Sequence, residues 1–313
     1  MSEKNNKTIF ITGGCGFVGR QLVKYLLDTN EYKKVVVCCH RKEAVANLSL
    51  SDNRLTIVEA DLLNPISYIP LLKKFKLHDI VHLAAIARFR QGEDNPNNTI
   101  KANFFGSLEL LHLSAQFDVN RFLCVSSNFA RNPKGVTGVS KYLTEAVIKK
   151  LETLPTVISL RLPNVIDSSG AVTLIFKRQI QKGEAVTLTD KRMTRKFITP
   201  KQAAEDIMFA LKNGNHQDVF VNNKPSTPIL KLAQDMINAS GKKIPIEFVG
   251  IRQGEKLQEE DYPSKIILPT GNKDIFRLTN NQHTDENINN AISMLRGKIS
   301  DKTISRIKDV FAQ

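Results

Sequence analysis

Residues 7–19 decide the fold, and they read K-T-I-F-I-T-G-G-C-G-F-V-G. A short apolar run at 9–11 leads into a cluster of glycines, and an amphipathic segment follows from Phe17 to about Asp28. Glycine lets the backbone bend tightly and approach a pyrophosphate, which then rests on the unpaired N–H groups of a helix N-terminus. This strand, turn and helix predict a dinucleotide site; the alternative is a glycine turn with a structural role alone. The predicted dinucleotide contacts in this stretch are Gly13, Gly16, Phe17, Val18 and Gly19.

The composition is that of an ordinary globular protein. The chain has 313 residues, 41% of them hydrophobic and 24% charged, which is enough for one large or two smaller domains. No apolar run approaches the roughly 20 residues that cross a membrane. The polar start M-S-E-K-N-N-K lacks the apolar core of a signal peptide. We therefore expect a cytoplasmic protein.

The cysteines and histidines show no metal-ligand spacing, and we expect no metal site. Three of the four cysteines (Cys15, Cys38, Cys39 and Cys124) fall in predicted buried strands. We therefore expect all four to be reduced core residues.

The net charge of +14, from 45 Lys and Arg against 31 Asp and Glu, could indicate nucleic acid, an anionic membrane or an acidic small ligand. The basic residues are spread along the chain, and no basic motif is interleaved with aromatic residues. This argues against nucleic acid. A phosphorylated ligand explains part of the charge, and solvated surface explains the remainder.

The rest of the chain alternates between strand and helix patterns. Short apolar runs rich in β-branched residues, of the kind buried in a parallel sheet, follow at 35–39, 55–59, 79–83, 121–125 and 157–162. Helical patterns lie between them at 43–48, 66–75, 99–117 and 138–151. The alternation predicts a Rossmann-type, doubly wound α/β fold with ligands at the carboxyl ends of the strands.

Two domains are expected. We assign residues 1–168 to a dinucleotide-binding Rossmann domain, to which 197–225 return. Residues 169–196 and 226–313 are assigned to a smaller C-terminal α/β domain that binds the substrate.

The end of the second strand bears on the choice of cofactor. A carboxylate there holds the 2′-hydroxyl of NAD, whereas a basic residue accommodates the 2′-phosphate of NADP. The sequence here is C-C-H-R-K, in which Arg41 can grip a phosphate with two parallel hydrogen bonds. We predict NADP rather than NAD, with contacts from His40, Arg41 and Lys42. The alternative is that Arg41 and Lys42 are solvated loop charges.

The loops after the third and fourth strands complete the predicted cofactor contacts. Asp61 can accept a hydrogen bond from the adenine amino group, or it can cap a helix. The other expected contacts are Leu62, Leu83, Ala84 and Ala85.

Several motifs together resemble a known superfamily. T-G-G-C-G-F-V-G, then A-D-L, H-L-A-A, and S-S followed by a lysine on the next helix are similar to the extended short-chain dehydrogenases/reductases. Residues 170–199 and 251–260 (I-R-Q-G-E-K-L-Q-E-E) resemble its polysaccharide-biosynthesis branch, which contains UDP-N-acetylglucosamine 4,6-dehydratases. The resemblance runs from about residue 7 to 268 and implies a nucleotide-sugar substrate, which that branch leads us to expect to be UDP-linked.

The redox pair of the superfamily is only half present. Its members use Tyr-x-x-x-Lys, in which the lysine holds the nicotinamide ribose and lowers the pKa of the tyrosine. Lys141 matches the lysine, but Thr137 stands where the tyrosine is expected. A spacing of four places both side chains on one helix face. Threonine is a poor base, yet it can hydrogen-bond a substrate hydroxyl.

A second catalytic motif has also changed. The family's 4,6-dehydratases use a Thr-Asp-Lys triplet after the fifth strand, and the matching residues are Ser127, Asn128 and Phe129. Asparagine cannot donate a carboxyl proton and phenylalanine cannot act as a base. Ser126 and Ser127 keep the hydroxyls expected to bind substrate or the nicotinamide carboxamide. Ordinary 4,6-dehydration is therefore disfavoured.

The resemblance also implies substrate contacts. Arg195 and Arg252 match positions expected near the nucleotide diphosphate, and Glu255 matches an acid expected near the ribose. Asn164 matches a residue that bonds the sugar or phosphate, although it could form a turn beside a proline. Lys177 is the remaining expected contact.

The sequence-based hypothesis is an NADP-dependent enzyme that oxidises the C4 hydroxyl of a UDP-N-acetylhexosamine, with dehydration, epimerisation or ketoreduction as the outcome. The alternative is a catalytically silent member that binds cofactor or nucleotide sugar. The apolar helices at 104–117 and around Lys141 could form a homo-oligomer interface, as is common in the superfamily, or pack in the core.

Overall fold

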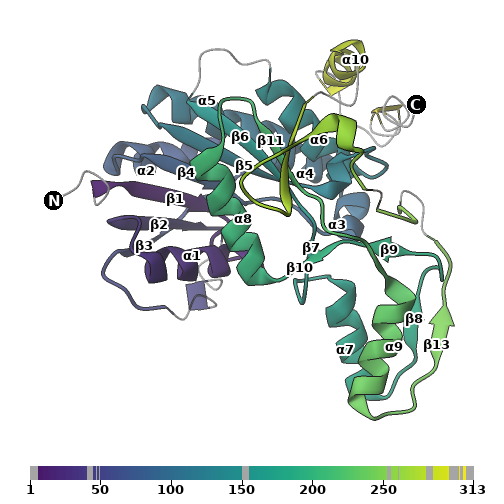
Figure 1. Cartoon of the computed structure of the whole chain (residues 1–313). Helices are drawn as coiled ribbons and strands as arrows, with labels where there is room; N and C mark the ends of the chain where they lie inside the picture. The colour runs from purple at the N-terminus through teal and green to yellow at the C-terminus, as the bar shows by residue number, and fades with distance from the viewer. Residues whose placement is uncertain are drawn as a thin grey trace.

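The structure is a computed structural model of the chain, and Figure 1 shows its arrangement. It describes residues 6–40, 45–46, 48, 50–149, 155–251, 255–259, 261–279, 285–295, 303 and 306–307.

Within the described residues, nine strands form one sheet in the order β14-β15-β11-β6-β5-β4-β1-β2-β3. The parallel strands are β1 (Thr8–Thr12), β2 (Lys34–Cys39), β3 (Leu55–Glu59), β4 (Asp79–His82), β5 (Arg121–Ser127), β6 (Thr156–Leu162) and β11 (Val219–Asn222). The antiparallel strands at one edge are β14 (Ile267–Pro269) and β15 (Ile275–Leu278). The predicted Rossmann-type fold is confirmed.

Both faces of the sheet are covered, which is why its strands read as continuous apolar runs. Ile9 and Ile11 of β1 belong to the core beneath α1 (Phe17–Thr29) and α8 (Pro200–Asn213). Phe10 belongs to the opposite core, against α2 (Ile69–Lys74) and α5 (Ser107–Gln116).

Two predicted helices are less regular than expected. The segment 66–75 is a 3₁₀ turn, η3 (Pro65–Tyr68), that continues into α2. The segment 99–117 is α4 (Pro96–Ile100), a π-helical stretch η4 (Lys101–Gly106), and α5. Of the predicted helix at 43–48, residues 43, 44 and 47 lie outside the described residues. The 3₁₀ turn η5 (Asn128–Ala130) follows β5, and α3 (Phe89–Asp94) and α6 (Val136–Ile148) complete this part.

A smaller lobe extends from the main body in Figure 1, carrying α7 (Val172–Lys182) and α9 (Ile229–Ser240). Their apolar faces share a separate core with Val186 and Leu188. Three short strand pairs complete it and join it to the main body: β7 (Asn164–Val165) with β10 (Phe197–Ile198), β8 (Val186–Leu188) with β13 (Ile246–Phe248), and β9 (Thr194–Arg195) with β12 (Thr227–Pro228).

The predicted domain boundaries need one correction. Residues 226–313 were assigned to the substrate domain, yet β14 and β15 extend the main sheet. The 3₁₀ turn η6 (Ser264–Ile266) leads into them, and α10 (Asp285–Leu295) packs on α6. The reason is that β11 would otherwise leave an unpaired sheet edge, and β15 pairs with it.

Part of the apolar surface considered for oligomerisation is covered within the chain. Val139, Tyr142 and Leu143 of α6 share a core with Ile288 and Ala291 of α10. These side chains are therefore buried inside one copy of the protein.

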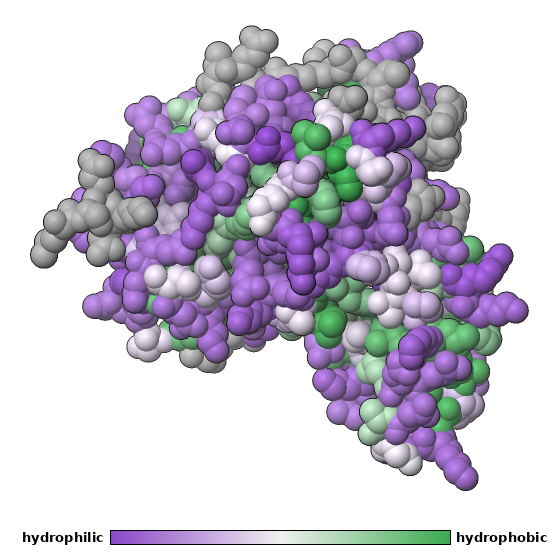
Figure 2. Space-filling view, in the orientation of Figure 1, coloured by the Kyte–Doolittle hydropathy of each residue, from purple (hydrophilic) through white to green (hydrophobic). Residues whose placement is uncertain are grey.

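The visible surface is mainly hydrophilic on the main body, and hydrophobic residues gather on the lobe (Figure 2). Ile175 of α7 and Phe248 of β13 are two exposed hydrophobic residues of the lobe. In the described part of the chain, we find no helix with the length and apolar character that spanning a membrane requires.

The expectation that all four cysteines are reduced is wrong for two of them. Cys15 and Cys39 form a disulfide, with a Cα–Cα distance of 5.6 Å. Cys38 and Cys124 are free and buried, as expected. The glycine turn brings Cys15 against the end of β2, an approach that strand patterning alone does not show.

Candidate functional site

The glycine turn has the geometry that the sequence pattern requires. Gly13 has φ +68°, and a Cβ there would lie 2.8 Å from the backbone N of Ala84. A Cβ on Gly19 would lie 2.3 Å from the carbonyl oxygen of Gly13. The N–H of Gly16 donates to that same carbonyl at 2.9 Å. Side chains are excluded, so that α1 begins directly beneath the turn.

The turn forms one wall of a pocket of about 600 Å³ at the carboxyl ends of the strands. Many predicted site residues line it together: Gly13, Gly16, Phe17, Val18, Gly19, His40, Leu83, Ala84, Ala85, Ser126, Ser127, Thr137, Lys141 and Asn164. Residues that sequence reasoning did not place in the site also line it: Cys15, Cys39, Ala87, Arg88, Gln91, Val125, Phe129, Leu162, Pro163, Val165, Ser168 and Ser169.

Thr137 and Lys141 lie on one face of α6, as their spacing predicts. Both are buried, and the Lys141 ammonium donates to the carbonyl of Val125 at 2.8 Å. Burial lowers the pKa of Lys141. The lysine is thus fixed between α6 and the end of β5.

Two hydroxyls in the pocket have no hydrogen-bond partner within the described structure, namely Ser126 Oγ and Thr137 Oγ1. Both atoms are buried, and an unsatisfied buried hydroxyl costs free energy. A ligand in the pocket would supply the missing partners. This observation, with the close glycine turn, fits a dinucleotide and a hydroxyl-bearing substrate.

Of the three residues at the positions of the family triplet, Ser127 ends β5 and caps the turn η5, and Asn128 and Phe129 lie within that turn. Ser127 Oγ accepts a hydrogen bond from the N–H of Phe129 at 3.2 Å. The Phe129 ring packs near that of Phe89, with centroids 6.5 Å apart. Asn128 does not line the pocket, and its side-chain oxygen is buried without a partner among the described residues.

His82 stabilises the end of β4 and does not line the pocket. Thr12 Oγ1 lies 2.7 Å from its Nδ1, and Ser107 Oγ lies 2.8 Å from its Nε2. Burial lowers the pKa of His82 to about 3, so that the imidazole is neutral. Thr12 Oγ1 also accepts from the N–H of Ala84 at 3.2 Å. The chain of contacts fixes the loop that passes the glycine turn.

Asn103 is a positioning residue that sequence reasoning missed. Its side chain exchanges two hydrogen bonds with the backbone of Ile86 and donates to Ser140 Oγ at 3.1 Å. It thereby ties the loop after β4 to α6. The signal in the sequence was an asparagine within the mainly apolar stretch A-N-F-F, and the structure buries its side chain fully.

At the far end of the pocket, His40 Nδ1 lies 3.4 Å from an oxygen of Asp61. The side chain of Asp61 also accepts a hydrogen bond from the N–H of Leu63, which is the kind of local contact that a capping residue makes. Asp61 does not line the pocket. Leu62 is buried beside Gly106. Arg41 and Lys42 lie outside the described residues.

The predicted substrate contacts are already engaged with one another. Arg195 donates to the carbonyls of Thr194 and Lys256, each at 2.8 Å. Its guanidinium lies 3.9 Å from carboxylate oxygens of Glu255 and Glu259, and burial lowers its pKa. These contacts bind β9 to the segment 255–259.

Asn164 connects this cluster to the pocket that it lines. Its amide donates to Glu259 at 2.9 Å and to the carbonyl of Lys196 at 3.1 Å. Lys177 is exposed and pairs with Asp167 at 3.3 Å, away from the pocket lining. Arg252 lies outside the described residues.

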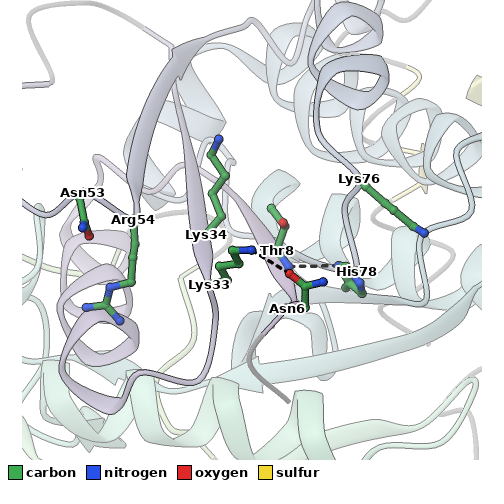
Figure 3. A pocket seen from close by; sticks show the side chains of 8 residues that line it. All are labelled: Asn6, Thr8, Lys33, Lys34, Asn53, Arg54, Lys76 and His78. Atoms are coloured by element: carbon green, nitrogen blue, oxygen red, sulfur yellow. Dashed lines mark hydrogen bonds between the residues drawn. The ribbon is translucent and has the colours of Figure 1, made fainter. Parts of the chain in front are cut away.

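A second pocket of about 520 Å³ lies at the opposite ends of the strands (Figure 3). Its basic side chains do not converge: Lys34 and Lys76 extend in different directions, and Lys33 donates to Asn6. Arg54 is paired with Asp52 at 2.7 Å. We therefore assign no ligand to it.

The Rossmann sheet, the glycine turn and the Lys141 pocket define an extended short-chain dehydrogenase/reductase fold. More narrowly, the chain belongs to the family described as "Polysaccharide biosynthesis protein", whose model matches residues 9–279.

Two proteins of similar sequence are consistent with this family assignment. A capsular polysaccharide biosynthesis protein of Staphylococcus aureus is 33% identical over 273 residues, which are 82% of this chain and 45% of that protein. This chain thus spans about half the length of that relative. A UDP-glucose 4-epimerase of Rickettsia canadensis is 28% identical over 264 residues, covering 81% of this chain and 77% of the relative.

A solved structure agrees on the fold. The dTDP-glucose 4,6-dehydratase DesIV of Streptomyces venezuelae, with NAD bound, has a TM-score of 0.75 at 20% identity. The match covers 83% of this chain and 89% of that one.

Proposed function

We propose that this protein is an NADP-dependent enzyme that oxidises the C4 hydroxyl of a UDP-linked N-acetylhexosamine during the synthesis of a surface polysaccharide or glycan. The observation that carries the proposal is the pocket that Lys141, Thr137 and Ser126 line beside the glycine turn. The family supports the polysaccharide assignment, and the epimerase relative supports a nucleotide sugar.

The residues beside the glycine turn would hold a nicotinamide cofactor, whose chemistry there would be to take a hydride from the sugar carbon and to return it. Lys141, held by the Val125 carbonyl, orients the cofactor through its remaining N–H groups. Thr137 and Ser126 offer unpartnered hydroxyls to the reacting hydroxyl of the substrate.

The proton of that hydroxyl needs an acceptor. No carboxylate or phenol belongs to the described lining of the pocket. The Thr137 hydroxyl stays protonated near neutral pH, but it can pass its own proton to water while it accepts one from the sugar. Because Asn128 and Phe129 supply neither acid nor base, we propose epimerisation or reduction of a 4-keto sugar ahead of dehydration.

The preference for NADP rests on the end of β2. No carboxylate is among the described residues that line the pocket there, and His40 is followed by Arg41 and Lys42. A 2′-phosphate would meet positive charge. Calorimetry with both cofactors tests this choice, and tighter binding of NAD would contradict it.

The decisive experiment incubates the protein with NADP and a panel of UDP-hexosamines, and separately with NADPH and their 4-keto derivatives. Products are identified by mass spectrometry and sugar analysis. We expect conversion that Lys141→Ala abolishes, together with weaker cofactor binding. The exposed Lys201→Ala on α8 is the matched control.

A second candidate function follows from the missing acid and base. The protein would bind cofactor or nucleotide sugar without turning it over and would act as a partner or regulatory subunit. Tight binding with no conversion of any UDP-sugar would favour this candidate, and Lys141→Ala would then change cofactor affinity alone.

A further inference from the structure

A pair of cysteines lies in the wall of the dinucleotide pocket. Cys15 stands between Gly14 and Gly16 of the turn, and Cys39 is the last residue of β2. Both line the pocket of about 600 Å³, and their Cα atoms are 5.6 Å apart. This separation lies within the range that a disulfide spans. The pair therefore joins the phosphate-binding turn to the strand end that faces the cofactor ribose.

The register of β2 selects this pair from the four cysteines. Side chains alternate along a strand, so that Cys38 and Cys39 face opposite sides of the sheet. Cys39 shares a core with Cys15 and α1, whereas Cys38 and Cys124 belong to the opposite core. Burial raises the pKa of each of these two thiols to about 11, which keeps them protonated.

The glycine turn also packs closely against the loop after β4 and against β2. A Cβ on Gly13 would lie 2.8 Å from Ala84 N, and one on Gly14 would lie 2.5 Å from Val37 Cγ1. Unbonded sulfur atoms need about 1.5 Å more separation than bonded ones. Because the turn cannot retreat into the sheet, the sulfur atoms of a reduced pair would separate toward the pocket.

We propose that Cys15 and Cys39 are a reversible redox site, and that their disulfide strengthens dinucleotide binding by fixing the turn on β2. The proposal rests on the dinucleotide site of the proposed function and adds its control by thiol oxidation. The pocket is open with the pair bonded, so that the bond preorganises the turn without blocking the ligand.

The oxidant is a low-molecular-weight disulfide that enters the open pocket. One cysteine thiolate attacks it, forms a mixed disulfide and releases a thiol, and the second cysteine displaces the other thiol. Two electrons pass from the protein sulfurs to the two released thiols, which also carry away the two protons. Cys15 is 8% exposed and Cys39 2% exposed, so that we expect Cys15 to react first.

Binding of the cofactor and the oxidation state of Cys15 and Cys39 must then be thermodynamically linked. If the disulfide tightens cofactor binding by some factor, bound cofactor makes the disulfide harder to reduce by the same factor. A preorganised turn is expected to give a factor of about three to ten.

The test uses the full chain treated with excess glutathione disulfide or with dithiothreitol. After thiol alkylation, peptide mass mapping should find residues 15 and 39 crosslinked only in the oxidised sample. Calorimetry with NADP and with NAD should then show about three- to tenfold tighter binding by the oxidised form. Cys39→Ser should remove this difference, and Cys38→Ala, on the opposite face of β2, should keep it.

Two results would overturn the inference. One is that Cys15 and Cys39 stay alkylatable after oxidation, and the other is equal affinity of the two forms. Failure of both forms to bind either dinucleotide would instead contradict the proposed function. The mass mapping reads the crosslink without any cofactor, so that the two failures are distinguishable.

Discussion

Thr137 and Lys141 lie one helical turn apart in the pocket, and only the lysine can carry charge. Thr137 Oγ1 is buried without a partner in the described structure, and the space beside it is limited because a Cβ on Gly92 would approach it within 2.4 Å. The hydroxyl therefore has a ligand contact available but little freedom to move. This environment suits a hydrogen bond to a substrate hydroxyl.

Thr137→Val keeps the shape of the side chain and removes that hydrogen bond. We expect turnover of the nucleotide sugar to fall about 10- to 100-fold because a buried substrate hydroxyl loses its partner. Cofactor affinity, measured by calorimetry, should change less than about twofold, since the Lys141 contact is untouched.

Thr144→Val is the matched control on α6. Thr144 Oγ1 donates to the backbone carbonyls of Asn103 and Ser140, away from the pocket lining. This variant should lose stability and keep its turnover. Unchanged turnover in Thr137→Val would contradict the catalytic role of the threonine.

At the scale of elements, α6 is fixed to the sheet by a buried ion pair. Arg161 of β6 donates to both carboxylate oxygens of Glu145, at 2.7 to 3.0 Å. Glu145 lies one turn after Lys141, so that the pair sets the position of the helix that carries the lysine. Both side chains are buried.

Glu145→Gln leaves the Arg161 charge buried without its counter-charge. We expect the free energy of unfolding to fall by about 3 kcal/mol, measured by urea denaturation. Glu109→Gln, at an exposed position of α5, should change it by less than about 0.5 kcal/mol. A loss no larger than that of the control would show that the pair does not hold α6.

A buried carboxyl joins α8 to β11 and should make stability depend on pH. Burial raises the pKa of Asp206 to about 6, and Asn222 donates to it at 2.8 Å. The folded state thus binds more protons than the unfolded state between the ordinary pKa of 3.8 and about 6. The stability from Asp206 is full below the lower value and is lost as pH rises through about 6.

Asp206→Asn removes this titration and keeps the contact with Asn222. We expect the variant to be about 1–3 kcal/mol more stable than the parent at pH 7, with the difference vanishing near pH 4. Thermal denaturation across this range measures it. The exposed Asp235→Asn on α9 is the control, and a difference independent of pH would refute the assignment.

The strands illustrate what local pattern can predict. Runs such as 35–39 are apolar throughout because both faces of the sheet are covered, and this signal is local. The pairing of β15 with β11 is not local, because it depends on a sheet edge formed by residues about fifty positions earlier. The Cys15–Cys39 bond was missed for the same reason.

The candidate site likewise has a part that the sequence predicts and a part that it does not. Glycine spacing and the position of Lys141 predicted residues that line one pocket, because turn geometry and helix period are local properties. Arg195 shows the limit, since it donates to the carbonyl of Lys256, a partner that only the tertiary fold brings near. A guanidinium in a sequence does not reveal whether its hydrogen bonds are already taken.

At the scale of the whole molecule, Glu259 joins the lobe to the pocket. Its carboxylate accepts from the N–H of Lys196 and from the amide of Asn164, each at 2.9 Å. It also faces Arg195 at 3.9 Å. The cluster links β7 at the pocket to the start of the lobe. If the lobe holds the nucleotide sugar, this cluster sets its position relative to the cofactor.

The variant Glu259→Gln therefore tests binding of the nucleotide sugar separately from binding of the cofactor. The buried Arg195 loses one of its two carboxylate partners and keeps Glu255. We expect about tenfold weaker binding of UDP with NADP binding changed less than twofold. Hydrogen exchange should rise in β9 and in 255–259, whereas the parallel strands β1 to β6 stay protected. Glu247→Gln, at an exposed position of β13 in the same lobe, should leave both affinities unchanged. If the affinities for UDP and for NADP fell equally, Glu259 would stabilise the whole protein and not the lobe in particular. Only a role specific to the lobe predicts that UDP affinity falls while NADP affinity is kept.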